Sequence, residues 1–147
     1  MSALVVFDSN SGNTQLIAEA VAEAIGPHTP TASVTGIGPD SLTGVDLLVV
    51  GCPIIGWRPS PRMQEFLNRL GHGSMRGIHA AAFDTRVRLP IHGDAAGRVS
   101  RALEAAGAHI AAKPAGFIVE GKTGPLAAGE LDRARQWAGS ITATPPG

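Results

Sequence analysis

The stretch FDSNSGNT, residues 7–14, separates a short apolar run from a segment with helical periodicity. The run before it, residues 3–7, is ALVVF, which is typical of a buried strand. The segment after it, residues 13–25, places its apolar side chains on one face of a helix. Between the two lie a glycine and five hydroxyl or amide side chains. This order of strand, polar loop and helix start is typical of a loop that binds an anion.

The donors in this loop suit a phosphate group. Free N–H groups and the helix dipole both favour an anion at a helix N-terminus. Ser9, Ser11 and Thr14 can donate hydroxyl hydrogen bonds, and Gly12 lets the backbone approach a ligand closely. No Lys or Arg lies in the loop, so a phosphate here would be bound by neutral donors alone. The alternative that stays open is a helix capped by Ser11 with a polar turn before it.

Apolar runs alternate with helical segments along the rest of the chain. Further strands are expected at Thr31–Val34, 46–51, 79–83 and Ala115–Val119, and further helices from Ser60-Pro61 onward, at 95–106 and at 129–141. The strongest strand, DLLVVG at 46–51, lacks polar alternation, as parallel strands buried on both faces do. The order predicts an α/β fold, a five-stranded, doubly wound parallel sheet with helices on both faces. One domain is expected over residues 1–142, followed by a short flexible tail at 143–147.

Sheets of this kind bind ligands beyond the carboxyl ends of their strands. The loops at those ends are expected at Asp8–Asn13, Cys52–Ser60 and Asp84–Asp94. A dinucleotide-binding motif is a poorer match, because Gly36-Ile37-Gly38 lacks the third glycine of that pattern.

Two of these loops carry a resemblance to a known family. SNSGNT, residues 9–14, resembles the phosphate loop of flavodoxins, and DLLVVGCPIIGW, residues 46–57, resembles their third strand and the loop against the flavin. The resemblance covers nearly the whole chain and implies a flavodoxin-like protein that holds FMN non-covalently and transfers single electrons. It implies phosphate contacts from six residues, Ser9, Asn10, Ser11, Gly12, Asn13 and Thr14. It implies ring contacts from Pro53, Ile54, Ile55, Gly56 and Trp57, with Gly56 at the glycine whose peptide can flip toward flavin N5.

The chain departs from the flavodoxin pattern around the ring. It contains no Tyr, and Ile55 stands where flavodoxins have their first stacking aromatic. Trp57 is expected either to replace that stacking or to pack in the core. The third loop, FDTRVRLPIHGD at residues 83–94, lacks the usual Gly-Asp-Ser-x-Tyr element. Contacts to the ring edge are expected here from Asp84, Thr85, Arg86 and Arg88.

The charged residues, histidines and cysteine indicate which partners, metals and compartment to expect. The formal net charge is zero, which gives no reason to expect nucleic acid or a membrane surface as a partner. The five His show no metal-ligand spacing, and the single Cys52 allows no internal disulfide, which fits the cytoplasm. Residues 58–101 hold eight Arg against three acids, so we expect Arg58, Arg62, Arg86 and Arg88 to form a basic rim near the flavin. Such a rim favours an acidic redox partner protein or an anionic small molecule.

Three functions are compatible with these features. The leading one is an FMN-binding electron carrier, since no catalytic acid or base is evident in the loops. One alternative is an FMN-dependent oxidoreductase that acts on a small anionic substrate at the Arg-lined mouth. The other is a flavodoxin-fold binding module that has lost FMN, which the missing aromatics favour and the intact SNSGNT opposes.

Overall fold

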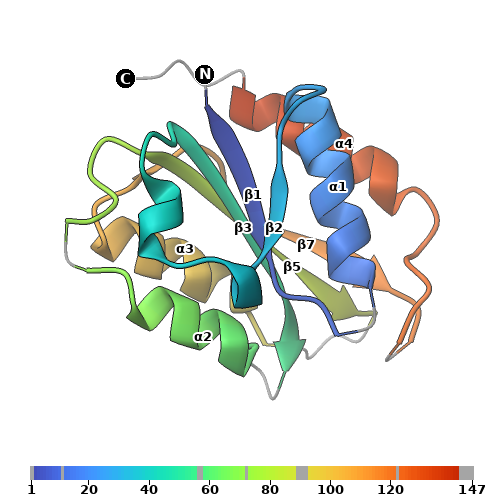
Figure 1. The fold of residues 1–147 in the computed structure, drawn as a ribbon. Helices are drawn as coiled ribbons and strands as arrows, with labels where there is room; N and C mark the ends of the chain where they lie inside the picture. Colours follow the sequence, from blue (N-terminus) through green and yellow to red (C-terminus); the bar gives the residue numbers. More distant parts are fainter. Residues whose placement is uncertain are drawn as a thin grey trace.

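A computed structural model describes residues 2–10, 12–55, 58–71, 73–88, 93–121 and 123–142, without the side chains of residues 39 and 40. The expected tail at 143–147 lies outside these ranges. A parallel sheet forms the centre of the molecule, with helices on both faces (Figure 1).

The sheet has the strand order of a doubly wound fold. Neighbouring strands run parallel in the order β2 (Thr31–Ser33), β1 (Ala3–Phe7), β3 (Leu47–Ile55) and β5 (His79–Val87). Two short strands share the next position: β6 (His109–Ile110) pairs with the start of β5, and β7 (Ala115–Val119) pairs with its end. The predicted five-stranded parallel sheet is therefore confirmed, with its last strand in two pieces. The strand order reverses between β1 and β3, which is where such sheets bind ligands.

Two helices cover each face of the sheet. The helices α1 (Asn13–Ile25) and α4 (Glu130–Thr142) lie on one face, and α2 (Pro61–Asn68) and α3 (Ala95–Ala105) lie on the other (Figure 1). Alternate residues of each strand face opposite layers, as the pleat requires. Val5 and Val49 thus pack in the core under α1 and α4, whereas Val6 and Val50 pack in the core under α2 and α3. Two 3-10 turns, Val34–Gly36 and Pro39–Leu42, lead from β2 toward β3.

The central strands are longer than predicted. β3 continues to Ile55 and β5 to Val87, so residues 52–55 and 84–87, which we expected in ligand loops, are strand. Cys52 pairs with Asp84, and Thr85 pairs with Phe117 of β7, so the polar end of β5 has a neighbour on either side. The apolar runs alone indicated strand ends at 51 and 83, because hydrogen bonds to neighbouring strands leave no mark in local hydrophobicity. A second unpredicted element, β4 (Arg58–Pro59), folds back antiparallel onto the end of β3.

Candidate functional site

The strands β1, β3 and β5 end at one edge of the sheet, the lower edge in Figure 1. The main chain joins the loop after β1 to β3 directly, since the Asp8 N–H donates to the Gly51 carbonyl at 3.0 Å. The helix α1 begins immediately after the first loop, so its N-terminus points at this edge (Figure 1). The polar stretch that the sequence singled out therefore lies at the point where the strand order reverses.

The N-terminus of α1 carries donors without helical acceptors. Its N-cap is Gly12, which has φ 91° and no side chain with which to cap the helix. The first backbone bond of the helix runs from the Leu16 N–H to the Gly12 carbonyl at 3.1 Å, so the N–H groups of the first turn have no acceptor inside the helix. Apart from Gly12 itself and its two neighbours in the chain, no described residue has an atom within 4 Å of the position that a Gly12 Cβ would occupy. The helix start is thus open to an approaching anion.

Side chains of the first loop hold its shape. Ser9 Oγ accepts the Gly12 N–H at 2.9 Å, which closes the loop on itself. The hydroxyls of Thr14 and Thr85 lie 2.9 Å apart in a buried pair that ties the first turn of α1 to β5. Asn13 is buried and Asn10 is exposed. Ser11 lies outside the described residues, so its expected phosphate contact stays a prediction, as does the alternative of a Ser11 cap.

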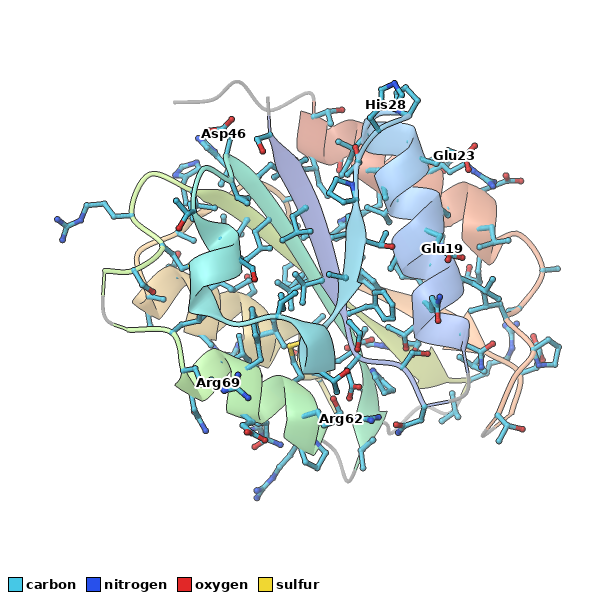
Figure 2. All side chains as sticks on the ribbon, in the orientation of Figure 1. Glu19, Glu23, His28, Asp46, Arg62 and Arg69 are labelled. Atoms are coloured by element: carbon cyan, nitrogen blue, oxygen red, sulfur yellow. The ribbon has the colours of Figure 1, made fainter. Side chains whose placement is uncertain are left out.

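Arg62 brings to this loop the cation that the loop itself lacks. It extends from the first turn of α2, its Nε lies 2.9 Å from Asp8 Oδ1, and its Nη2 donates to Asn10 Oδ1. Figure 2 shows it at the same lower edge of the molecule, although it is 52 residues beyond Asn10 in the chain. Arg62 was expected only as part of a general basic rim, and its contact with Asp8 and Asn10 was not predicted. This contact could have been expected from the adjacency of β1 and β3 in the sheet, which brings the segment after β3 to the loop after β1.

Two buried polar atoms near these loops have no hydrogen-bond partner among the described residues. They are Asp8 Oδ2 and Ser60 Oγ, in side chains that are almost fully buried. Buried polar atoms in native folds are nearly always hydrogen-bonded, so an unpartnered pair near a sheet edge indicates a place for a polar ligand. A ligand hydroxyl can both donate and accept, so it suits either a carboxylate oxygen or a serine hydroxyl.

The last residues of β3, which were expected in the second loop, present apolar side chains near the edge. Pro53 and Ile54 are half-buried, and Ile55 is one of the exposed large hydrophobic side chains, with 39% of its surface accessible. Ile55 pairs with Arg58 across the β3–β4 hairpin, so its backbone is held in place. Gly56 and Trp57 are not among the residues that the structure describes, and their expected ring contacts stay predictions.

The third set of predicted residues has partners inside the protein. Asp84 is fully buried and accepts two bonds from Arg86, from Nε at 2.7 Å and from Nη2 at 2.6 Å, and a third from the Ala96 N–H at 2.9 Å. The hydrogen bond to Asp84 raises the pKa of Arg86 above its usual value. Arg88 is exposed and pairs with Glu120 at 2.7 Å. The structure thus gives Asp84 and Arg86 a role in holding β5 to α3, and Thr85 a role beside Thr14.

Cys52 lies beneath the site and is fully buried. Burial raises its pKa to about 12, and the nearby charges of Asp84 and Asp8 add to the rise, against a hydrogen bond from the Ser60 backbone that lowers it. The thiol is therefore protonated at neutral pH and behaves as a small apolar side chain.

We expect native Cys52 to resist alkylation. Iodoacetamide at pH 8 should modify it roughly a thousandfold more slowly than the same cysteine in the unfolded chain, because the thiolate is the reactive form. Mass spectrometry of samples quenched over time, with and without guanidinium chloride, measures both rates. Rapid labelling of the folded protein would show that Cys52 is accessible and that its pKa is not raised.

Neither a metal site nor a membrane-spanning helix is present in the described ranges. No group of three or more His, Cys, Asp and Glu side chains there is arranged to hold a metal ion. No helix there is long and apolar enough to span a membrane.

Comparison with solved structures shows the flavodoxin fold. A flavodoxin from the domain Archaea superposes with a TM-score of 0.81 over 97% of both chains, at 20% sequence identity. Flavodoxin 1 from Bacillus cereus gives 0.81 over 96% of this chain and 97% of its own, at 17% identity. Rubredoxin oxygen:oxidoreductase from Desulfovibrio gigas gives 0.77 at 17% identity, with 97% of this chain matching 36% of that one. No family model matches the sequence, and neither does any curated protein. The fold class that the sequence predicted is therefore confirmed.

Proposed function

We propose that this protein binds FMN and transfers electrons. The observation that carries the proposal is the open N-terminus of α1, where Gly12 takes a left-handed conformation at the sheet edge between β1 and β3. Similarity to flavodoxins over nearly the whole chain supports it. FMN supplies the redox chemistry, since its isoalloxazine ring accepts and releases electrons, and the protein supplies binding and environment.

The chain's own residues suggest how FMN would be held. The N–H groups of the first turn of α1 and the hydroxyls of Ser9 and Thr14 are the donors for the phosphate. Arg62 pairs with Asp8 beside Asn10, and it thereby offsets the negative charge that this carboxylate would add next to a bound phosphate. Asp8 Oδ2 and Ser60 Oγ are available to ribityl hydroxyls. Ile55 offers apolar contact to the ring, with Gly56 and Trp57 following it in the same segment.

A titration of the apoprotein with FMN and with riboflavin tests the proposal. Riboflavin lacks the phosphate, so FMN should bind at least roughly a hundredfold more tightly if the loop holds that group with two or more charge-assisted bonds. Quenching of flavin fluorescence gives both dissociation constants. Equal affinity for the two ligands, or no binding of either by folded protein, would contradict the proposal.

The variant Thr14→Val tests whether the loop binds the phosphate group of FMN. Valine keeps the shape of threonine but removes the hydroxyl, so FMN affinity should fall roughly tenfold while riboflavin affinity stays unchanged. Thr35→Val is the matched control, since Thr35 is exposed in the turn after β2 and bonds to Ser33, away from the loop. A thermal melt of each variant checks that the fold survives. Equal losses for FMN and riboflavin would place the effect in the fold and not at the phosphate.

The expectation of an acidic redox partner stays a prediction, and its basis changes. Three of the four arginines that we expected in a basic rim lie against acids: Arg62 on Asp8, Arg86 on Asp84 and Arg88 on Glu120. The remaining member, Arg58, has no ion pair within the described part of the chain. Of the four arginines expected in the basic rim, only Arg58 has a positive charge that no described acid pairs with.

A further inference from the structure

Arginines that form no ion pair with a described residue gather in one place. The chain has ten arginines, and six of them lie within 4 Å of a carboxylate. Of the other four, Arg58, Arg98 and Arg101 line a single pocket of about 350 Å³. The pocket is lined by residues of β4, α2 and α3. Figure 1 shows the two helices on the same face of the sheet. The volume of the pocket is in the range of small-molecule sites.

The described walls of this arginine pocket contain no carboxylate. Its five other lining residues are amide or apolar: Pro59, Gln64, Leu67, Asn68 and Ala102. Gln64 Nε2 donates to the Pro59 carbonyl at 2.7 Å, which ties β4 to α2. Arg98 and Arg101 are three residues apart on α3 and therefore share a face of that helix. Three like charges around one cavity repel each other, and a bound anion relieves that repulsion.

We propose that the arginine pocket binds a small anion carrying at least two negative charges, through its phosphate or carboxylate groups. The guanidinium fork matches both groups with paired hydrogen bonds, and three arginines can neutralise a dianion completely. The pocket shares no described lining residue with the phosphate loop, which lies at the edge of the sheet where α1 begins. Arg58 follows Trp57 in the chain, so the anion would bind next to the segment expected to cover the flavin.

A titration followed by NMR tests the proposal on the intact protein saturated with FMN. Pyrophosphate and citrate serve as probes, each added at constant ionic strength with sodium chloride as balance. The Nε–H signals of Arg58, Arg98 and Arg101 and the side-chain amide of Asn68 should shift and saturate with either probe. Shifts that grow without saturation, or that sodium chloride alone reproduces, would overturn the proposal.

Two variants separate the pocket from general surface charge. Arg98→Gln combined with Arg101→Gln should weaken both probes by roughly tenfold or more, since two charged donors are lost. Arg69→Gln removes a charge from α2 at a residue paired with Glu65, and it should leave probe binding unchanged. Equal weakening by Arg69→Gln would show that only net charge matters and would overturn the proposal.

Two further measurements distinguish a small-anion pocket from a protein-docking surface and from the flavin site. A glutamate trimer that binds more tightly than citrate would favour a surface for an acidic protein and would overturn the small-anion assignment; weaker binding supports it.

FMN titration of the double arginine variant should match the wild-type protein, which separates this pocket from the proposed flavin site. If apoprotein that fails to bind FMN still saturates with citrate at the same arginine signals, the pocket stands without the proposed function.

Discussion

Replacing Gly51 with alanine is expected to destabilise the protein by about 3 kcal/mol or more, because the added methyl group has no space. A Cβ at Gly51 would lie 2.0 Å from Cζ of Phe83 and 2.3 Å from both Cε atoms of that ring. Gly51 and Phe83 are direct neighbours in the pairing of β3 with β5. The ring has little freedom to move, since it is fully buried and packs edge-on against Phe117 and Trp137, each with a centroid 5.9 Å away.

The effect of this substitution should reach the candidate site. The Gly51 carbonyl accepts the Asp8 N–H, so a displaced β3 also displaces the start of the first loop. Urea unfolding followed by circular dichroism measures the loss of stability, and FMN titration measures the change at the loop. Gly139→Ala is the matched control, because Gly139 is exposed in α4 with no described neighbour within 4 Å of its Cβ position. That change should stabilise the protein by about 0.5–1 kcal/mol.

A second variant shows whether the clash with Phe83 is the cause. Phe83→Leu shortens the facing side chain and makes room at Gly51. The double variant should therefore be more stable than the sum of the two single changes predicts, as expected for residues in contact. Strict additivity, or a Gly51→Ala protein as stable as the wild type, would show that the strands adjust without cost.

Replacing Asp84 with alanine is expected to cost about 3–5 kcal/mol, because it leaves a guanidinium without its buried partner. Asp84 has no exposed surface and accepts bonds from Arg86 and from the Ala96 N–H near the start of α3. The Arg86 side chain lies over Gly116 of β7, where a Cβ would approach Arg86 Nε to 2.2 Å. Loss of the carboxylate thus removes a link between β5, β7 and α3 near the carboxyl edge of the sheet.

Removing both charges should restore much of the lost stability. The double variant Asp84→Leu with Arg86→Met replaces the ion pair by apolar side chains of similar size, and such exchanges are often neutral. The surface pair Arg88 and Glu120 is the control, and exchanging both for glutamine should leave the unfolding midpoint unchanged. Urea unfolding of all four proteins makes the comparison. A double variant as unstable as Asp84→Ala would mean that the carboxylate acts through the Ala96 N–H and not through Arg86.

Local sequence patterns were sufficient to predict the helices and the order of the main strands along the chain. The apolar face of residues 13–25 and the Ser60-Pro61 start signal correspond to α1 and α2 as observed. The alternation of strands with helices indicated the parallel, doubly wound sheet, because only long crossovers can join parallel strands. The loop at residues 8–13 was placed at the site edge for the same reason.

Only the tertiary structure decided the ends of the central strands and the environment of the loops. Residues 84–87, three of which are polar, are strand because β7 pairs with them, and the pairing of buried Asp84 with Arg86 follows from that extension. Arg62 meets Asp8 and Asn10, and Arg58 joins Arg98 and Arg101, across long separations in the chain. Periodicity and capping act between residues a few positions apart, so the sequence states them directly. Which charge meets which across the sheet edge depends on how whole elements pack, and no local pattern records it.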